Sequence, residues 1–388
     1  MKSATTAALM NDQELLDSVV EQTGLSDFGA DEFRVGLRVV IASAADADLT
    51  DQQRQSLQAG WRANLEKRLR LVELRKRRPE ITREVIEAPL AVIGLPRTGT
   101  TALVDLLAQD PAARAPLQWE TGNLFPPADK SKWADDPRIA QVQARMDADA
   151  PNSPMVALGL HTPGARLPDE CNSFMAMNFW TPNLSATAVL PRYVEWLRLS
   201  RPERPYMAHR WVLQHLQAHG PAGRWVLKSP FHCFGLAELL TEYPDAMFVQ
   251  THRDPVDLLA SNAGLLSTIR GFGPGHPGRQ LTGREQVELW GTGLQRCLAA
   301  RADPALDARV LDISHHDVVK QPIETLRRVY AHFDLPFTAE AERGARTWLQ
   351  NPAQHRSTVR FTLEDFGLTA ADVEAGFGPY RERFAAYF

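Results

Sequence analysis

The segment from Gly94 to Thr101 has the residue types and the spacing of a loop that binds phosphate. It reads GLPRTGTT, and its two glycines, Gly94 and Gly99, match the nucleotide-binding pattern G-x-x-x-x-G-K-[ST]. Thr100 replaces the lysine of that pattern, and Thr101 fills its hydroxyl position. In such a loop, successive backbone N–H groups and the N-terminus of the following helix form a nest for anionic oxygens. The segment therefore predicts an anion site.

The missing lysine changes which anion this loop is expected to hold. In ATPases that lysine reaches the outer phosphates while the hydroxyl helps to hold Mg²⁺. Here Arg97 can bracket a terminal anionic group, while Thr100 and Thr101 can donate hydroxyls to an inner phosphate. The pattern therefore favours a mixed anhydride with less charge than ATP. The alternative is a strand–turn–helix with two glycines and an ordinary N-terminal turn.

A second set of polar residues lies where an apolar run ends. The segment FVQTHRDP, residues 248–255, contains Arg253, and Ser261 follows eight positions later on an expected helix. Open α/β sheets bind ligands at the carboxyl ends of their parallel strands. Arg253 can therefore contact a second phosphate through two N–H groups, with a hydroxyl contact from Ser261. Taken alone, Arg253 would more readily be interpreted as a partner of Asp254 or as a cap.

The two motifs together resemble those of the sulfotransferases that use 3′-phosphoadenosine 5′-phosphosulfate (PAPS). In that family an early [KR]-[ST]-G-T-T loop holds the 5′-phosphosulfate, and a later R-D-P with a serine eight residues on holds the 3′-phosphate. The corresponding residues here are Arg97, Thr98, Gly99, Thr100, Thr101, Arg253 and Ser261. The segments GLPRTGTT, WVLKSPFH, THRDP and TLEDFGL are similar to those of a bacterial branch, so the resemblance runs from about residue 88 to the end.

The resemblance also implies a late basic loop that touches the 3′-phosphate. The segment from Asn351 to Leu368 offers Arg356 and Arg360 for this contact, matched by basic character and not by fixed spacing. An exposed surface pair is the alternative. PAPS is then the donor substrate and adenosine 3′,5′-bisphosphate (PAP) the product. Because the phosphosulfate is already activated, no metal is expected to be required.

Sulfuryl transfer to a hydroxyl requires removal of the acceptor proton and stabilisation of the charge on the leaving phosphate. Arg97 is the first candidate for the leaving group, and Lys228, at the carboxyl end of a second expected strand, is the next. For the proton acceptor, the resemblance to tyrosine-acting members favours Glu120, which follows the helix after the loop. Members that use a histidine leave His161 and His232 as alternatives.

Short apolar strands that alternate with helices are expected to position these residues. The strands are expected at residues 89–95, 224–227, 246–251 and 308–313. Each is followed by a helical pattern, which predicts an α/β fold with a parallel central sheet flanked by helices. The resemblance implies a P-loop NTPase-like sulfotransferase architecture with helical N-terminal and acceptor-side insertions.

The domain organisation follows from the same pattern. Residues 1–87 read as helices and are predicted to cap the main domain, whereas residues 88–388 are predicted to form the sulfotransferase domain. Within it, residues from about 111 to 205 are expected to be an insertion on the acceptor side. Its first part, residues 111–170, is rich in Pro, Asp and Ala and is expected to be irregular.

An apolar stretch of this insertion offers an acceptor pocket. Met, Phe and Trp side chains there either line an adaptable pocket or form the core of a helical cap. They are Met155, Phe174, Met175, Met177, Phe179, Trp180 and Trp196. Asp169 and Glu170 are nearby and could orient a hydroxyl. The pocket interpretation predicts a hydrophobic small molecule or lipid as the acceptor, because no basic cluster suited to an anionic glycan is seen.

Composition and charge exclude several partners. A formal charge of −4, from 43 basic and 47 acidic residues, gives no overall attraction to nucleic acid or to an anionic membrane. No apolar run is long enough to span a bilayer, and no signal peptide is seen. The three cysteines, Cys171, Cys233 and Cys297, are too far apart to suggest a disulfide framework or a zinc site, and they fit the cytoplasm. The N-terminal helices could form an interface between copies of the chain.

The alternative function is that of a P-loop phosphotransferase or kinase that uses ATP and Mg²⁺. Such an enzyme would need a lysine where Thr100 stands and an aspartate at the end of an apolar strand for the metal. The sequence offers only Asp312, in VLDIS, as a poor candidate for that aspartate.

Overall fold

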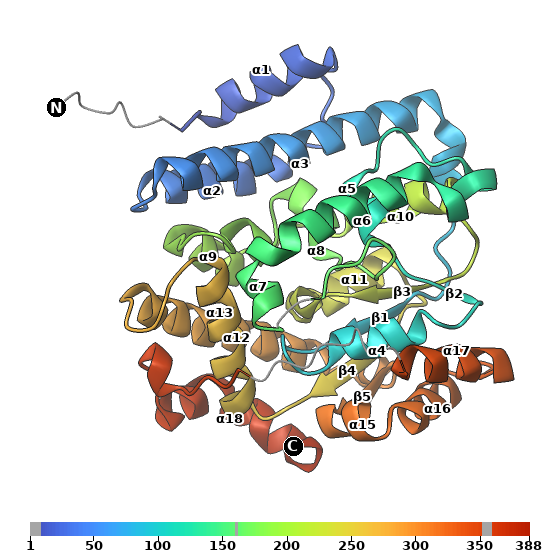
Figure 1. Ribbon diagram of the computed structural model, residues 1–388, viewed down its shortest axis with the longest axis vertical. Coiled ribbons are helices and arrows are strands. Elements are labelled where there is room, and N and C mark those ends of the chain that lie inside the picture. The colour runs from blue at the N-terminus through green and yellow to red at the C-terminus, as the bar shows by residue number, and fades with distance from the viewer. Residues whose placement is uncertain (1–8, 160–161, 351–358) are drawn as a thin grey trace.

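The computed structural model describes residues 9–159, 162–350 and 359–388. A five-stranded parallel sheet with the strand order β2-β3-β1-β4-β5 forms its centre (Figure 1). The strands are β1 (Leu90–Ile93), β2 (Ala113–Arg114), β3 (Arg224–Lys228), β4 (Met247–His252) and β5 (Val310–Ser314). The predicted α/β fold with a parallel sheet is confirmed. Strand β2 was not predicted, because its two residues lie in the segment expected to be irregular.

Helices cover both faces of the sheet, as two core clusters show. Leu90 and Val92 of β1 share one cluster with Leu103 of α4 (Thr100–Leu107) and Leu326 of α16 (Pro322–His332). The intervening residues, Ala91 and Ile93, belong to the other cluster, with side chains of α10 (Met207–Ala218), α11 (Leu236–Glu242) and α13 (Gly278–Ala300). Strand β1 is apolar throughout because successive side chains enter opposite cores.

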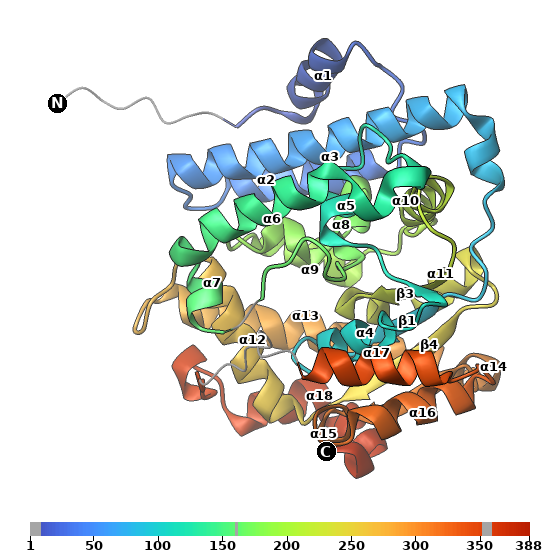
Figure 2. The same cartoon turned by 45° about the vertical axis from the view of Figure 1, so that its right-hand side comes forward.

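The N-terminal helices form a layer on the far side of the molecule from the C-terminal helices (Figures 1 and 2). They are α1 (Asp12–Thr23), α2 (Phe33–Ala45) and α3 (Asp51–Arg77). The guanidinium of Arg68 on α3 is fully buried and donates hydrogen bonds to Phe28 O and to Asn178 Oδ1, each at 2.7 Å. This contact fastens the layer to the segment that follows α8 (Asn172–Met175).

The expectation that residues 111–170 are irregular was wrong. They contain α5 (Gln118–Gly122), α6 (Pro137–Asp149) and α7 (Pro154–Ala157). Helix α6 starts with Pro137 at its first position, and the side chain of Asp136 accepts a hydrogen bond from the N–H of Arg138. Ile139, Val142 and Met146 have helical spacing and pack in one cluster with Trp119, so a short apolar stripe was present in the sequence and was overlooked among the many Pro, Asp and Ala residues.

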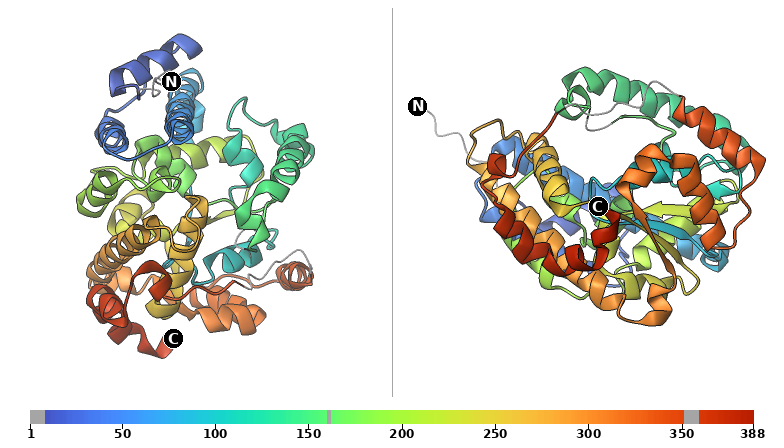
Figure 3. Two further views of the ribbon diagram at one scale, coloured as in Figure 1. Left: turned by 60° about the vertical axis from the view of Figure 1, so that its left-hand side comes forward. Right: turned by 90° about the horizontal axis from the view of Figure 1, so that it is seen from below.

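The remaining helices complete the two covering layers. They are α9 (Pro191–Leu199), α12 (Pro255–Ile269), α14 (Pro304–Asp307), α15 (His315–Lys320), α17 (Ala339–Leu349) and α18 (Ala370–Phe384). Helix α13 packs against both α12 and α18 (Figure 3). Among the described residues, no helix combines the length and the apolar character needed to cross a membrane.

Candidate active site

The loop between β1 and α4 has a backbone that only particular residues allow. Gly94 and Gly99 have φ angles of 128° and 91°, in the region that favours glycine. A Cβ atom on Gly94 would lie 2.6 Å from Thr251 O, and one on Gly99 would lie 2.8 Å from His315 Nδ1. The loop is therefore packed against the end of β4 and the start of α15, which both lie at the carboxyl edge of the sheet.

The two sequence motifs meet at this edge. The Nε atom of Arg97 donates a hydrogen bond to Ser261 Oγ at 3.1 Å, and Nη1 of Arg253 donates to Arg97 O at 3.3 Å. Strand pairing explains the meeting, because Ile93 at the end of β1 lies opposite Gln250 of β4. The structure thus brings together Arg97, Arg253 and Ser261.

Positive charge in this place is poorly compensated. No carboxylate among the described residues lies within ion-pair distance of Arg97, and Arg253 has only Asp257, at 3.7 Å. Burial, and after it the charge of Arg253, lowers the pKa of the Arg97 guanidinium. Arg97 itself has a φ angle of 70°, which is strained for a residue with a side chain. Two close arginines with so little negative charge nearby form a site suited to an anion.

The three threonines of the loop have different surroundings. Thr98 is fully buried, and its hydroxyl donates to Leu95 O at 2.7 Å and lies 2.6 Å from Thr251 Oγ1. Its side chain is thus used inside the protein, and its backbone N–H is the part that remains for a ligand. Thr100 is buried, whereas Thr101 is exposed and accepts a hydrogen bond from Lys228 Nζ at 2.9 Å.

Lys228, the last residue of β3, connects the loop to an acidic side chain. Besides its bond to Thr101, its Nζ atom lies 2.8 Å from Glu170 Oε1, and the side chain is only 5% exposed. Asp105 lies one turn after Thr101 on α4, and burial raises its pKa to about 6 although Lys228 opposes that shift. Lys228 thus contacts one carboxylate and acts electrostatically on a second, and titratable groups perturbed in this way are common at functional sites.

Glu120 occupies a different place. Its carboxylate accepts hydrogen bonds from Arg114 Nη2 at 2.9 Å, Trp133 Nε1 at 2.7 Å and the N–H of Leu117 at 3.2 Å. Glu120 and Arg114 are both almost completely buried, so they form a closed ion pair. The structure does not bring this carboxylate into contact with Lys228.

The other predicted site residues are spread out. His161 and Arg356 lie outside the described residues, and Arg360 is exposed. His232 is fully buried, and burial lowers its pKa well below the usual value. Five of the seven apolar residues proposed for a pocket, Phe174, Met175, Met177, Phe179 and Trp180, belong instead to the main core cluster. Of the two alternatives that the sequence left open for these five residues, the core describes them correctly.

Two contributors to the site could not be assigned from sequence. The sequence predicts Glu170 only as a group that could orient a hydroxyl, because its pairing with Lys228 depends on a tertiary contact. His315 lies beside the loop, where burial and then Arg253 lower its pKa, so it is neutral near pH 7. His315 could have been identified from its position directly after the fourth predicted strand, because ligands bind at the carboxyl ends of parallel strands.

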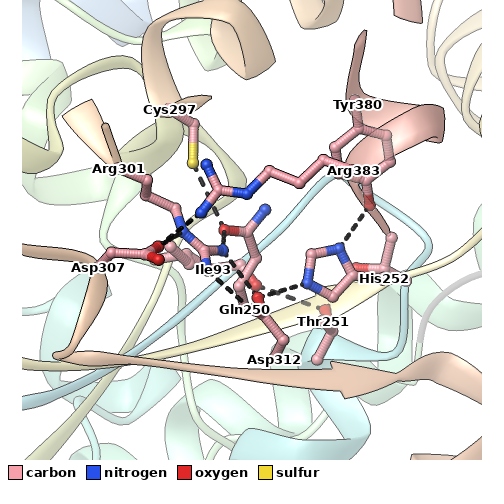
Figure 4. Close-up of polar contacts among 11 residues, drawn as sticks. Ile93, Gln250, Thr251, His252, Cys297, Arg301, Asp307, Asp312, Tyr380 and Arg383 are labelled. Atoms are coloured by element: carbon pink, nitrogen blue, oxygen red, sulfur yellow. Dashed lines mark hydrogen bonds and ion pairs between the residues drawn. The ribbon is translucent and has the colours of Figure 1, made fainter. Parts of the chain in front are cut away.

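Asp312, the aspartate considered for a metal ion, has both carboxylate oxygens bound by other side chains. Its Oδ1 accepts from Arg301 Nη1 and lies 2.7 Å from His252 Nε2, and its Oδ2 accepts from Arg301 Nη2 at 2.8 Å (Figure 4). Burial alone would raise its pKa, but the hydrogen bonds from Arg301 and His252 lower the pKa of Asp312 to about 2. An aspartate held in this way is not free to bind Mg²⁺.

A cavity of about 660 Å³ lies at the opposite edge of the sheet. Its lining includes Leu90, Val226 and Arg224, at the amino ends of β1 and β3. The loop follows the carboxyl end of β1, so the cavity is separated from Arg97 by the length of the strand. It does not form part of the arginine site.

These features define an α/β protein with a glycine-containing loop and two close arginines at the carboxyl edge of a parallel sheet. A family model described as the sulfotransferase family matches residues 89–339, well over half of the chain, and the protein belongs to that family.

Two solved structures extend the likeness to nearly the whole chain. Sulfotransferase STF9 from Mycobacterium avium is 28% identical, with a TM-score of 0.88 and 97% of each chain covered. Sulfotransferase STF1 from Mycobacterium tuberculosis H37Rv is 30% identical, with a TM-score of 0.80, and the match covers 96% of this chain and 99% of that one. No curated protein sequence matches.

Proposed function

We propose that the protein transfers a sulfuryl group from PAPS to a hydroxyl of a hydrophobic small-molecule or lipid acceptor. The observation that carries the proposal is the contact of Arg97 with both Ser261 and Arg253. A nucleotide with a 5′-phosphosulfate and a 3′-phosphate needs two anion sites within the length of one adenosine, and the meeting of the two motifs supports this assignment. Membership of the sulfotransferase family supports the same donor.

The donor is bound by groups at the two motifs. Backbone N–H groups of Gly99, Thr100 and Thr101 at the start of α4 bind the 5′-phosphosulfate, together with the Arg97 guanidinium. Arg253 and Ser261 bind the 3′-phosphate, with Arg356 and Arg360 as further candidates. Thr98 contributes its backbone, because its hydroxyl is buried against Thr251.

The transfer step moves one proton and breaks one sulfur–oxygen bond. The acceptor oxygen bonds to sulfur, the bridging oxygen leaves with PAP, and the acceptor proton passes to a base. We assign Lys228 and Arg97 to the negative charge that develops on the leaving phosphate. The bond from Lys228 to Thr101 supports this role, because it places the ammonium group at the first turn of α4.

Two carboxylates compete for the role of the base. Glu120 is favoured by the family resemblance, but its oxygens are held by Arg114 and Trp133. Glu170 is partly exposed and adjoins Lys228, so we propose Glu170 as the proton acceptor.

The two bases are distinguished by matched variants, Glu170→Gln and Glu120→Gln. Glu170→Gln should bind PAP normally and lose about 10²- to 10⁴-fold in turnover. Glu120→Gln should lose stability, because Arg114 is left buried without its partner, while the turnover of the folded fraction is kept. Near-normal turnover in Glu170→Gln would remove it from the mechanism.

An apolar acceptor is supported by the segment next to the anion site. Helix α7, with the half-buried Met155 and Val156, packs against α12, which carries Ser261. Apolar side chains near the donor suit a hydrophobic alcohol or phenol better than a polyanion. A panel of hydroxyl compounds incubated with ³⁵S-labelled PAPS tests this assignment, and labelling of glycans alone would contradict it.

The donor is tested by thermal unfolding with PAP, ADP and ATP with Mg²⁺. A ligand at roughly 100 times its Kd stabilises a protein by about 2.7 kcal/mol. We expect a response to PAP that is independent of metal, and little response to ATP with Mg²⁺. The reverse order would favour the phosphotransferase alternative, against which Asp312 already counts, because its carboxylate is bound by Arg301 and His252.

A further inference from the structure

Three side chains of metal-binding type meet in the core. They are Cys171, just before α8, His209 on α10, and His232 in the 3-10 turn η6 (Pro230–Phe234). Their ligand atoms all lie within 4.8 Å of one another. All three residues are completely buried.

The two imidazoles have an unusual hydrogen-bonding pattern. The Nδ1 atom of His209 lies 2.7 Å from Tyr243 Oη, and that of His232 lies 3.1 Å from Tyr206 Oη. The Nε2 atoms of both rings are buried and have no hydrogen-bond partner. Leaving a buried polar atom unpaired costs about 1–3 kcal/mol, and two such atoms in one cluster call for an explanation.

We propose that Cys171, His209 and His232 bind a transition-metal ion, with Zn²⁺ as the natural occupant. A thiolate and two imidazoles are preferred ligands of Zn²⁺, whereas Mg²⁺ and Ca²⁺ prefer oxygen. The tyrosine hydroxyls at Nδ1 fix each ring with its Nε2 free, which is how second-shell groups orient metal-bound histidines. The orphan nitrogens are then the ligand atoms.

The distances fit an ion after a small contraction. In a tetrahedral zinc site, neighbouring S and N ligands are about 3.5 Å apart. Because the ligand atoms here lie within 4.8 Å of one another, no pair would have to close by more than roughly 1.3 Å. A fourth, small ligand such as water would complete the coordination. Binding releases the thiol proton of Cys171, since the thiolate is the ligand. The imidazoles are already neutral, because burial lowers the pKa of His209 to about 3 and moves that of His232 in the same direction.

The ion would join three segments next to Lys228. The N–H of Cys171 donates a hydrogen bond to Lys228 O at 2.8 Å, and the preceding residue, Glu170, pairs with Lys228 Nζ. His232 lies in η6, which directly follows the end of β3 at Lys228. The ion would therefore hold Glu170 against Lys228, and this positioning role rests on the proposed function. The proposal that an ion binds here does not depend on the proposed function, and the ion takes no part in the transfer step.

The metal content of the untagged full-length chain tests the site directly. Protein prepared with added ZnSO₄ and then dialysed should retain zinc at one ion per chain by mass spectrometry. Replacing zinc by Co²⁺ should give thiolate-to-cobalt absorption in the near ultraviolet and tetrahedral bands in the visible. Folded wild-type protein that keeps neither ion would overturn the proposal.

Matched cysteine variants locate the ion. Cys171→Ala should lose the near-ultraviolet cobalt band, whereas Cys297→Ala should keep it, because Cys297 is an equally buried cysteine whose Sγ contacts Gln250 instead. A band that survives in Cys171→Ala would refute this ligand set. If Cys171→Ala does not fold, His209→Gln provides the second test by the same readout.

Activity measurements test the positioning role of the ion separately from the existence of its binding site. Removal of the ion with a chelator should lower turnover while the thermal response to PAP is unchanged, because the donor motifs lie elsewhere. Unchanged turnover of the metal-free protein would overturn the positioning role. Loss of the PAP response in the metal-loaded protein would instead count against the proposed function.

Discussion

Two arginine sites border strand β4, and they differ in how their charge is balanced. Arg301 is almost completely buried and donates to Asp307 Oδ1 at 2.6 Å and to both oxygens of Asp312 (Figure 4). Although burial acts in the opposite direction, those carboxylates raise the pKa of Arg301. Arg97 has no carboxylate at ion-pair distance among the described residues, and burial lowers its pKa. The charge of Arg301 is thus neutralised by two aspartates, whereas that of Arg97 is not neutralised by any described carboxylate at ion-pair distance.

The largest effect is expected on stability when the balanced arginine is removed. Arg301→Ala leaves the largely enclosed Asp312 with only His252 as its partner, and breaking a buried pair costs about 3–5 kcal/mol. Urea unfolding measures the loss. Arg97→Ala is the matched control, because deletion of an unbalanced charge should leave the free energy of unfolding unchanged or raise it. Equal losses in the two variants would contradict the comparison.

The second effect is expected on turnover. Arg97→Ala removes a donor to the developing charge, and such a loss lowers kcat about 10²- to 10³-fold. Steady-state rates with labelled PAPS measure it. Arg327→Ala, a surface arginine paired with Glu342, should retain full turnover and serves as the control. A normal rate in Arg97→Ala would exclude its catalytic role.

A third prediction concerns two aspartates, Asp105 and Asp312, whose pKa values are shifted in opposite directions. The pKa of Asp105 is raised to about 6, so the wild-type protein loses stability as the pH rises from about 4 to 6 and stays lower above that range. Asp105→Asn removes this loss and should be more stable at pH 8 by up to about 3 kcal/mol, with no gain at pH 4.

Asp312→Asn is the control for Asp105→Asn and should behave in the opposite way. The pKa of Asp312 is lowered to about 2, so its contribution is present above about pH 4 and is lost as the pH falls toward 2. Asp312→Asn should therefore be less stable than the wild-type protein at pH 8. Denaturant titrations at the two pH values measure both variants, and a stabilised Asp312→Asn would contradict the assignment.

The smallest effect is expected on donor affinity. Arg253→Ala removes one charged hydrogen-bonding group from the proposed 3′-phosphate site, which is worth about 1.5–3 kcal/mol. Calorimetry should show weaker binding of PAP, while adenosine 5′-phosphate, which lacks the 3′-phosphate, should bind equally to variant and wild type. An equal loss for both nucleotides would place Arg253 elsewhere on the ligand.

The sequence predicted those parts that depend on local pattern. The four strands around the loop are apolar runs flanked by turns, and the Gly94–Thr101 and Arg253–Ser261 motifs are contiguous, so each could be identified and their meeting followed from parallel pairing. Partners that meet only through tertiary contacts could not be found in this way. Glu170 against Lys228 is one case, and the cluster around Cys171 is another, since its ligands are far apart in the chain.

Apolar character alone also left two alternatives that only packing decides. Phe179 and Trp180 have the same side chains in a core as in a pocket, and the structure places them in the core. Glu120 was assigned by its position after a helix, which does not specify where its carboxylate points. Its direction is set by Arg114 and Trp133, which lie in a segment expected to be irregular.

The hydroxyl contact between Thr98 and Thr251 has a consequence for the speed and the thermodynamics of donor capture. Because it joins the middle of the loop to the end of β4, it should restrict the loop to one conformation before any nucleotide arrives. The loss of chain freedom that a flexible loop would suffer on binding has then taken place during folding. Association should accordingly proceed in a single kinetic phase, with a modest unfavourable entropy, and Thr98→Val should slow it without altering the charge of the site.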